Sequence, residues 1–298
     1  MRARQLEVFT AVMRAGTVTG AARLLNTSQP ALSQVLRQTE DELGFNLFDR
    51  DKGRLTPTPE AIELHPEAER LFGELEGLRR KAADLRLGRA GLVRIGCSTP
   101  PAMSVLPLVL SAFRASHPSV ALRCNVAPVQ ALEKMLREGD ASLALALNNE
   151  TTPELEAEVL GRIGFCCLLP DEHPLAERQT LSLADLEDEF VISYNTNTRP
   201  RDELDRAALQ AGAQFSPSME IDTSISAVGF VQAGLGVAVV DALLPWQQFD
   251  GLHLRPLTDS PALPLAMLTL RERSLSRAEE LMRGQIRDLI PRNLPAIS

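Results

Sequence analysis

The stretch from residue 17 to residue 57 constrains the fold of this chain more than any other. Its residues predict a short amphipathic helix over 17–25, a polar break at 26–28 and a second helix from about Gln29 to Leu43. Two short helices joined by such a turn form a helix-turn-helix, whose second helix enters the major groove of DNA. The stretch therefore predicts a domain that reads DNA.

The start of the second helix has the local chemistry that this interpretation requires. Thr27 or Ser28 can cap the helix, because a hydroxyl can accept a hydrogen bond from an otherwise unpaired amide of the first turn. Pro30 falls in that first turn, where it removes no hydrogen bond inside the helix. An ordinary surface helix with polar residues fits the same pattern and remains the alternative.

The predicted DNA contacts come from one face of this helix and from the charged hairpin that follows it. Glutamine can pair with adenine and arginine with guanine, whereas basic residues of a hairpin at 49–54 would meet phosphates. A solvated turn is the alternative for the hairpin. The acidic run at 40–42 is expected to face away from DNA. The predicted DNA-binding residues are Thr27, Ser28, Gln29, Pro30, Ser33, Gln34, Arg37, Arg50, Lys52 and Arg54.

A series of residues at characteristic spacings runs through residues 1–60: Arg4-Gln5-Leu6, Phe9, Gly16-Thr17-Val18-Thr19, Ala21-Ala22, Leu24, Ser28-Gln29-Pro30-Ala31-Leu32-Ser33, Glu40, Leu43-Gly44, Leu47-Phe48, Arg50 and Thr56-Pro57-Thr58. With these residues, this part of the chain resembles the winged helix-turn-helix domain of LysR-type transcriptional regulators. Two departures are Ala61, where the family usually has glycine, and Gln34, where arginine is common. Residues 11–25 and 231–241 also resemble the subgroup that responds to amino acids and opines.

Length and charge bound the remaining organisation. A chain of 298 residues exceeds one typical domain, so two or three units are expected. The net charge is −8, and residues 1–60 hold eight basic against seven acidic residues, so the DNA-reading part is only locally basic. The motif, rather than bulk charge, indicates DNA binding.

Residues 59–89 predict a helix with an apolar seam. Leucines and alanines recur there at alternating steps of four and three, which is a heptad pattern over about three repeats. The alternative is an amphipathic helix packed on its own chain. The family resemblance implies that this helix pairs two copies, and adds a tetramer built as a dimer of dimers. The predicted dimerisation residues are Leu64, Leu71, Leu75, Leu78 and Leu85.

From about residue 90 the chain alternates strands and helices, which predicts α/β lobes with parallel, helix-covered sheets. The layout resembles the two-lobed, periplasmic-binding-protein-like sensor of the family. We therefore expect a DNA-binding domain at 1–58, a linker helix at 59–89 and an effector-binding domain at 90–298. Its first lobe would comprise about 90–161 and 266–298, and its second about 162–265.

Such lobes bind small molecules between them, where strands end and helices begin. Free amides and hydroxyls at these points favour an anion, so the sequence predicts a carboxylate-bearing effector. Arg199 could clamp a carboxylate with two hydrogen bonds. Simple helix capping is the alternative for each segment. The predicted effector-binding residues are Ser98, Thr99, Asn148, Tyr194, Asn195, Thr196, Arg199 and Thr223.

The cysteines and histidines predict neither a metal site nor a cofactor. Cys97, Cys124, Cys166 and Cys167 lie in apolar, strand-like surroundings at no zinc-binding spacing, so buried thiols are expected, with a redox switch as the alternative. The chain has no export signal and no run of about 18 apolar residues, so a cytoplasmic location is expected.

The predicted function is a DNA-binding transcriptional regulator, not an enzyme, that responds to a small molecule such as an amino-acid derivative. Its expected partners are double-stranded DNA with two half-sites, the effector and further copies of the chain. No catalytic dyad, nucleophile elbow or phosphate-binding loop is apparent in the sequence. A cytoplasmic small-molecule binding protein or an α/β enzyme without DNA binding are the alternatives.

Overall fold

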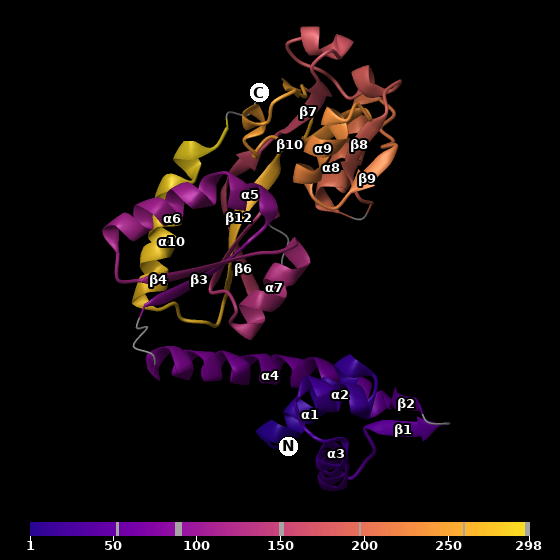
Figure 1. Cartoon of the computed structure of the whole chain (residues 1–298), viewed down its shortest axis with the longest axis vertical. Helices are drawn as coiled ribbons and strands as arrows, with labels where there is room; N and C mark the ends of the chain where they lie inside the picture. Colours follow the sequence, from indigo (N-terminus) through magenta and orange to yellow (C-terminus); the bar gives the residue numbers. More distant parts are fainter. Residues whose placement is uncertain (52–53, 87–90, 149–151, 197, 259, 296–298) are drawn as a thin grey trace. The chain divides into compact units, whose positions relative to one another are not determined.

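The computed structural model of the chain describes residues 1–51, 54–86, 91–148, 152–196, 198–258 and 260–295 (Figure 1). The chain separates into two compact units, one made chiefly of residues 1–88 and the other of most of the remainder. Family resemblance predicted a domain boundary at 58 and another at 89, and a long helix, α4 (Pro59–Arg86), fills the interval between them.

The first unit begins with three helices whose ends are fixed by local chemistry. These are α1 (Ala3–Ala15), α2 (Val18–Leu24) and α3 (Gln29–Leu43). Gly16 and Gly44 end α1 and α3 in the left-handed conformation, which costs glycine little. Ser28 caps α3 by accepting a hydrogen bond from the amide of Ala31 at 3.4 Å. The predicted helix-turn-helix is therefore present, and Ser28 rather than Thr27 is the capping residue.

A two-stranded hairpin follows the helices. Strand β1 (Phe48–Asp51) pairs antiparallel with β2 (Arg54–Pro57). Glu40 of α3 holds the base of the hairpin, because its carboxylate accepts hydrogen bonds from the amides of Leu47 and Phe48. Thr58 then caps α4 by accepting from the amide of Ala61, which is fully buried. The buried core under these elements comprises Val8, Phe9, Ala11, Val12, Ala21, Ala22, Leu32, Leu36, Leu47, Phe48, Ala61 and Ala68.

The second unit contains two five-stranded sheets (Figure 1). The first sheet has the order β4-β3-β5-β12-β6 and forms lobe 1. Its strands are β3 (Leu92–Cys97), β4 (Ala121–Val126), β5 (Leu143–Ala146), β6 (Leu155–Ile163) and β12 (Leu263–Leu270). Its helices are α5 (Thr99–Met103), α6 (Val105–Ser116), α7 (Val129–Glu138) and α10 (Arg277–Leu289).

Lobe 2 is built on the second sheet, with the order β11-β7-β10-β8-β9. Its strands are β7 (Phe165–Pro170), β8 (Val191–Tyr194), β9 (Met219–Ile221), β10 (Val237–Asp241) and β11 (Leu252–Pro256). Its helices are α8 (Arg199–Ala211) and α9 (Ala227–Gln232), and short 3-10 turns join them to the strands, including η3 (Ser224–Ser226). The chain enters lobe 2 between β6 and β7 and returns to lobe 1 between β11 and β12.

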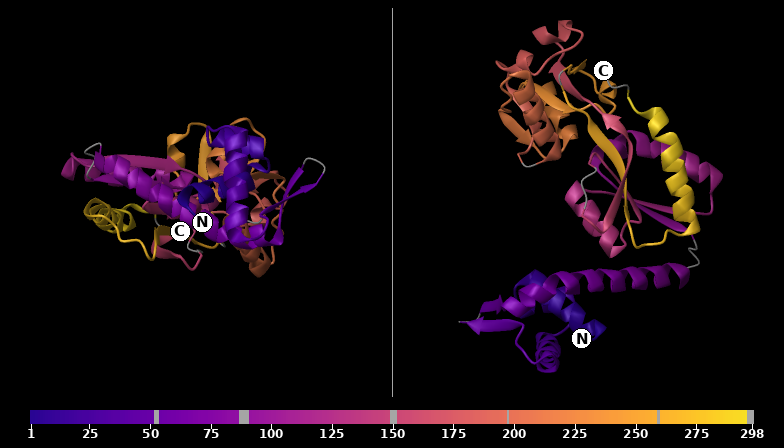
Figure 2. Two further views of the ribbon diagram at one scale, coloured as in Figure 1. Left: turned by 90° about the horizontal axis from the view of Figure 1, so that it is seen from below. Right: turned by 180° about the vertical axis from the view of Figure 1, so that it is seen from behind.

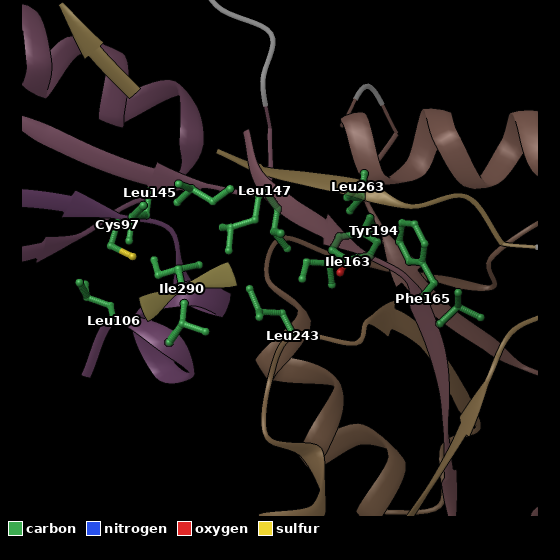
Figure 3. Packing of buried hydrophobic residues seen from close by; sticks show 14 of the residues in the cluster. Cys97, Leu106, Leu145, Leu147, Ile163, Phe165, Tyr194, Leu243, Leu263 and Ile290 are labelled. Carbon is green, nitrogen blue, oxygen red and sulfur yellow. The ribbon is translucent and has the colours of Figure 1, made fainter. Parts of the chain in front are cut away.

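Helices cover both faces of the first sheet. Residues of α6 and α10 pack with one face in a core that includes Val93 and Ile95, and α10 runs alongside the strands (Figure 2). Leu132 and Leu136 of α7 pack on the opposite face. The first of these cores continues into lobe 2 through residues such as Ile163, Phe165 and Leu243 (Figure 3). The two lobes therefore share one apolar core where the chain crosses between them.

Both sheets are mixed: the predicted parallel pairing is present between β3 and its neighbours β4 and β5, and between β8 and its neighbours β9 and β10, but other strands are antiparallel. Strand β12 runs antiparallel to β5 and β6, and β7 runs antiparallel to β10 and β11. The sequence did not predict β6 or β11. Strand β6 carries charged residues, and Glu158 on it pairs with Arg287 of α10 at 2.6 Å, a contact between residues distant in the sequence. Ser104 separates the short helix α5, which follows β3, from α6.

Candidate DNA-contact surface and effector cleft

The exposed face of α3 gathers the predicted base-contacting residues. Gln29, Pro30, Gln34 and Arg37 are exposed, and Ser33 is half-buried between them. These side chains line one shallow hollow together with Gln38 and Asp41. The amide of Gln29 donates to the hydroxyl of Ser33 at 3.0 Å, which holds the two at the N-terminal end of the helix. Such an array can present donors and acceptors to base edges.

The acidic residues of α3 do not all face away from this surface. Glu40 is directed to the hairpin base, and Glu42 accepts a hydrogen bond from Gln38 at 3.4 Å. Asp41, however, lies on the hollow with Arg37, because it follows Gln29, Ser33 and Arg37 at steps of four residues. The expectation that the whole run 40–42 points away from DNA was therefore wrong for Asp41.

The remaining predicted DNA contacts lie in the turn and the hairpin. Thr27 is half-buried in the turn, where its amide donates to the carbonyl of Ala22 at 3.0 Å. Lys52 lies outside the described residues, as do the side chains of Arg50 and Arg54, although the backbones of the last two belong to β1 and β2. Their phosphate-contacting role stays a prediction.

The predicted seam of α4 is divided between two environments. Leu64 packs against the core of its own unit, beside the buried Ala68, so it does not belong to an exposed seam. Leu71 and Leu78 are 45% and 65% exposed, and Leu75 is half-buried. The side chain of Leu85 lies outside the described residues. An apolar stripe along α4 is thus partly open to solvent between Leu71 and Leu78.

On lobe 1, the predicted effector residues follow strands β3 and β5. The amide of Ser98 donates to the carbonyl of Leu145, which fixes Ser98 beside β5. Ser98 is only 7% exposed, and its hydroxyl makes no hydrogen bond with any described group. Thr99 begins α5 and is half-buried, as is Asn148 beyond the end of β5. Because α5 has only five residues, a helix dipole contributes little here.

Lobe 2 approaches this point through η3, which contacts α5. Thr223 directly precedes η3 and is half-buried, and its contact with the effector stays a prediction. The neighbouring Ser224 was not predicted. It is 1% exposed, and its hydroxyl makes no hydrogen bond of normal geometry, although it lies near enough to Asp241 to lower the pKa of that carboxyl.

The polar cluster after β8 contains carboxylates that sequence reasoning missed. Because β8 and β9 are parallel neighbours with Tyr194 opposite Ile221, Glu220 and Asp222 lie beside the residues that follow Tyr194. The hydroxyl of Thr196 donates to Glu220 at 2.6 Å, and the amide of Asn195 donates to Asp222. The hydrogen bonds from the side chain and the amide of Thr196 are the largest cause of a lowered pKa at Glu220. The predicted hydroxyls and amides of this segment thus lie beside two carboxylates.

The cation nearest this cluster is Arg201. Its guanidinium lies 3.1 Å from the Glu220 carboxylate and donates to the carbonyl of Tyr194 at 3.4 Å. Arg199, which was predicted to clamp the effector, instead pairs with Glu203 one turn along α8 at 3.4 Å. The sequence could not distinguish the two arginines, because both lie in the first turn of the same helix.

Tyr194 belongs to a buried hydrogen-bond network rather than to an open cleft wall. Its hydroxyl donates to a carboxylate oxygen of Asp241 at 2.9 Å and accepts from the amide of Asp241 at 2.8 Å. Burial raises the pKa of Tyr194 well above its usual value, and burial likewise raises the pKa of Asp241. The effector-contact prediction for Tyr194 was wrong, because its single polar atom is already hydrogen-bonded in the core.

Three of the four thiols are buried, as expected. Burial raises the pKa of Cys97, Cys166 and Cys167, but Cys124 is exposed on the edge strand β4. In the part of the chain that the structure describes, no group of three or more His, Cys, Asp or Glu residues is arranged to hold a metal ion. Nor does any helix among these residues combine the length and apolar character needed to cross a membrane.

Comparisons with known proteins agree with this geometry. The family model described as "Bacterial regulatory helix-turn-helix protein, lysR family" matches residues 3–62, and that of the "LysR substrate binding domain" matches residues 86–290. The chain is 32% identical over 241 residues to the regulatory protein NocR of Agrobacterium fabrum, covering 81% of this chain and 80% of NocR. It is also 31% identical over 292 residues to the transcriptional activator protein LysR of Escherichia coli, and the match covers 97% of this chain and 93% of that protein.

The fold also matches solved structures. CbnR, described as a LysR family transcriptional regulator, superposes with a TM-score of 0.70 at 19% identity over 99% of this chain and 100% of CbnR. The full-length CbnR in a complex with its target DNA superposes with a TM-score of 0.69 at 21% identity, over 96% of this chain and 100% of that CbnR chain. At this identity the likeness concerns the fold alone.

We expect Tyr194→Phe to destabilise the second unit through Asp241, with a penalty that grows with pH. The change leaves a buried carboxylate oxygen and a buried amide without a partner, which costs about 1–3 kcal/mol. Burial raises the pKa of Asp241 in the folded protein above its value in the unfolded chain. The stability that the protonated Asp241 contributes is therefore complete below the unfolded-chain pKa and is lost as the pH rises through the folded-state pKa. The hydrogen bond from Tyr194 favours the ionised carboxylate, so its removal costs more at the higher pH. Thermal melts at acidic and mildly alkaline pH measure this.

The control for the Tyr194→Phe experiment is the same change in an Asp241→Asn background. Asparagine does not titrate, so the pH-dependent part of the Tyr194→Phe penalty should disappear there. An equal penalty at both pH values in the presence of Asp241 would contradict the coupling.

Proposed function

The chain belongs to the LysR family of bacterial helix-turn-helix regulators, and we propose that it controls transcription in response to a carboxylate-bearing metabolite such as an amino-acid derivative. Double-stranded DNA, an effector and further copies of the chain are its partners, because regulators of this family bind DNA as oligomers. We place its action in the cytoplasm, where bacterial DNA lies, and assign it no catalytic role.

The observation that carries the effector proposal is the buried hydroxyl of Ser98, which has no hydrogen-bond partner among the described residues. A buried polar group without a partner costs free energy, so a ligand that accepts a hydrogen bond from it gains affinity. On the other lobe, Thr223 precedes η3 and offers a second hydroxyl. Two hydroxyls on neighbouring elements suit the two oxygens of a carboxylate.

Acceptors on lobe 2 support an amino-acid derivative in particular. Asp222 and Glu220 lie beside Asn195 and Thr196, and each bonds one of these side chains. An ammonium or amide group of a ligand could take the place of those donors. A zwitterion would then present its carboxylate to the serine and threonine hydroxyls and its nitrogen to the carboxylates. The likeness to NocR, a regulatory protein, is consistent with a small-molecule effector but does not identify one.

The proposed response is closure of the two lobes about their crossing segments. Ser98 and Thr99 belong to lobe 1 and Thr223 to lobe 2, so a ligand that contacts both favours the closed form. A ligand shifts such an equilibrium only through unequal affinity for the two forms. In an oligomer, closure would alter how the paired DNA-binding units are presented to DNA.

Pairing through α4 is the proposed basis of that oligomer. Leu71 and Leu78 follow each other at a heptad step and are exposed, which leaves an apolar stripe that a second copy of the helix can cover. Two recognition helices would then address two half-sites on one face of the duplex. A dimer of such dimers would give the tetramer implied by the family resemblance.

Arg37→Ala should weaken binding to the operator by about 1–3 kcal/mol if Arg37 pairs with guanine, because that pairing is lost with no replacement. Arg114→Ala is the control: Arg114 is an exposed arginine of α6 in the second unit, and its removal changes net charge equally. Gel-shift titrations with the DNA upstream of the chain's own gene measure both. Unchanged operator affinity in a folded Gln29→Ala, Gln34→Ala, Arg37→Ala triple variant would contradict the groove assignment.

Leu71→Asp combined with Leu78→Asp should separate the paired linker helices, because it places charges in the apolar stripe. Light scattering should report a smaller assembly, and operator affinity should fall. Leu209→Asp is the matched control, since Leu209 is 81% exposed on α8 and lies outside the stripe. Unchanged mass and affinity in the double variant would show that α4 does not pair the copies.

Ser98→Ala and Thr196→Ala should each lose the response to an effector found by a thermal-shift screen of amino acids and small carboxylates. Basal operator binding should persist, because neither residue lies in the first unit. Ser116→Ala provides the control, since that exposed hydroxyl bonds only the carbonyl of Ala112 within its own helix at 3.1 Å. If both variants responded like the wild type, the effector would bind elsewhere.

A further inference from the structure

The second unit has a cavity that contains none of the predicted effector residues. Its volume is about 480 Å³, within the range typical of small-molecule sites. Lobe 1 contributes Leu108, the crossing segment contributes Gly164 and Phe165, and lobe 2 contributes Leu243 and Trp246. The segment around Leu294 completes the wall. The cavity therefore touches both lobes and the strand that joins them.

The described part of the lining is uncharged. No Asp, Glu, Lys, Arg or His is among the described residues that border the cavity. Two of its polar groups already donate elsewhere: the hydroxyl of Ser104 to the carbonyl of Pro100 at 2.8 Å, and the indole of Trp246 to the carbonyl of Asp241 at 2.7 Å. An ionised ligand would lose hydration there without gaining a counter-charge, which is costly. Since Gln247, Ser260 and Asn293 also border the cavity, the chemistry suits a neutral molecule that combines apolar surface with hydrogen-bonding groups.

We propose that this cavity is a second ligand site, for an uncharged small molecule, distinct from the carboxylate site. The half-exposed Leu108 would border the entrance, and the almost fully buried Phe165, Leu243 and Trp246 would lie beneath the ligand. Its occupant differs from the proposed effector in charge, so the two sites select different molecules.

The cavity is also connected to the effector cleft through covalent neighbours. The loop that carries Leu243 and Trp246 begins at Asp241, whose carboxylate accepts from the amide of Leu243 at 3.1 Å and from the hydroxyl of Tyr194. Asn195 of the cleft directly follows Tyr194. A molecule that contacts Leu108 and Trp246 at once senses the relative position of the lobes, so its binding is coupled to lobe closure. This coupling, unlike the site itself, rests on the proposed function.

The test uses Trp246, which is the only tryptophan in the chain. The neutral probe 1-N-phenylnaphthylamine should bind the full-length protein, gain fluorescence and accept excitation energy from Trp246. The matched probe 8-anilino-1-naphthalenesulfonate has closely related rings but carries a sulfonate, and should bind at least about tenfold more weakly. Equal binding of the two probes, or saturation by the neutral probe without loss of Trp246 emission, would overturn the proposal.

A variant that fills the cavity provides the second test. Gly164→Leu should reduce binding of the neutral probe at least about tenfold, because a Cβ at Gly164 meets no atom within 4 Å and the leucine can occupy the space. Gly284→Leu is the matched control, because position 284 is equally open but lies on the exposed face of α10. Wild-type probe affinity in Gly164→Leu would overturn the proposal.

Leu108→Arg keeps the test decisive if Gly164→Leu fails to fold. Leu108 is 52% exposed, so arginine there is compatible with folding while it brings a charge to the cavity wall. Loss of neutral-probe binding supports the site, and unchanged binding overturns it.

For the coupling, the neutral probe should change operator affinity at least about twofold in the wild type and not in Gly164→Leu. An unchanged operator affinity overturns the coupling, whereas absent operator binding without probe counts against the regulator function instead.

Discussion

The hydrogen-bonded pair of Tyr194 and Asp241 determines how the second unit is arranged around its functional surfaces. Both side chains are buried, and a buried carboxyl is tolerated only when its oxygens have partners. Tyr194 ends β8 and Asp241 ends β10, so their contact aligns the ends of two parallel strands. Beyond one strand begins the polar cleft segment at Asn195, and beyond the other begins the loop that lines the uncharged cavity. One interaction thus positions both candidate sites.

Elements governed by neighbouring residues were predictable from sequence, whereas elements governed by tertiary pairing were not. Helix α3 was predicted with its observed bounds, because Ser28 caps it, Pro30 suits its first turn and Gly44 ends it. Strand β6 escaped prediction because its charged residues resemble a loop until Glu158 meets Arg287. Strand β12 is antiparallel to its neighbours because the chain re-enters lobe 1 from lobe 2 at this strand. The residues of β12 themselves do not indicate this direction.

The residues of the candidate sites likewise differ in how far neighbouring sequence determines their surroundings. Ser98 and Thr223 could be proposed from the sequence because each follows a strand and precedes a helical turn, and the structure brings their segments together. Glu220 and Asp222 could not, since their place beside Thr196 and Asn195 depends on the register of β8 with β9. Tyr194 was misassigned for a related reason. Its partner, Asp241, lies 47 residues away, so its hydroxyl appeared available when only the neighbouring sequence was considered.

The weak charge of the DNA-binding unit makes assembly part of its recognition chemistry. Non-specific affinity for DNA grows with the number of phosphates that basic residues neutralise, and residues 1–60 hold only eight basic residues against seven acidic ones. Asp41 even places a negative charge on the face of α3 that carries Gln29 and Arg37. A single unit of this kind gains little from electrostatics and depends on a few base contacts. Joining two units raises the effective concentration of the second after the first has bound, without any new contact to DNA. If the exposed apolar stripe of α4 pairs two copies as proposed, it contributes to operator affinity together with the recognition helix.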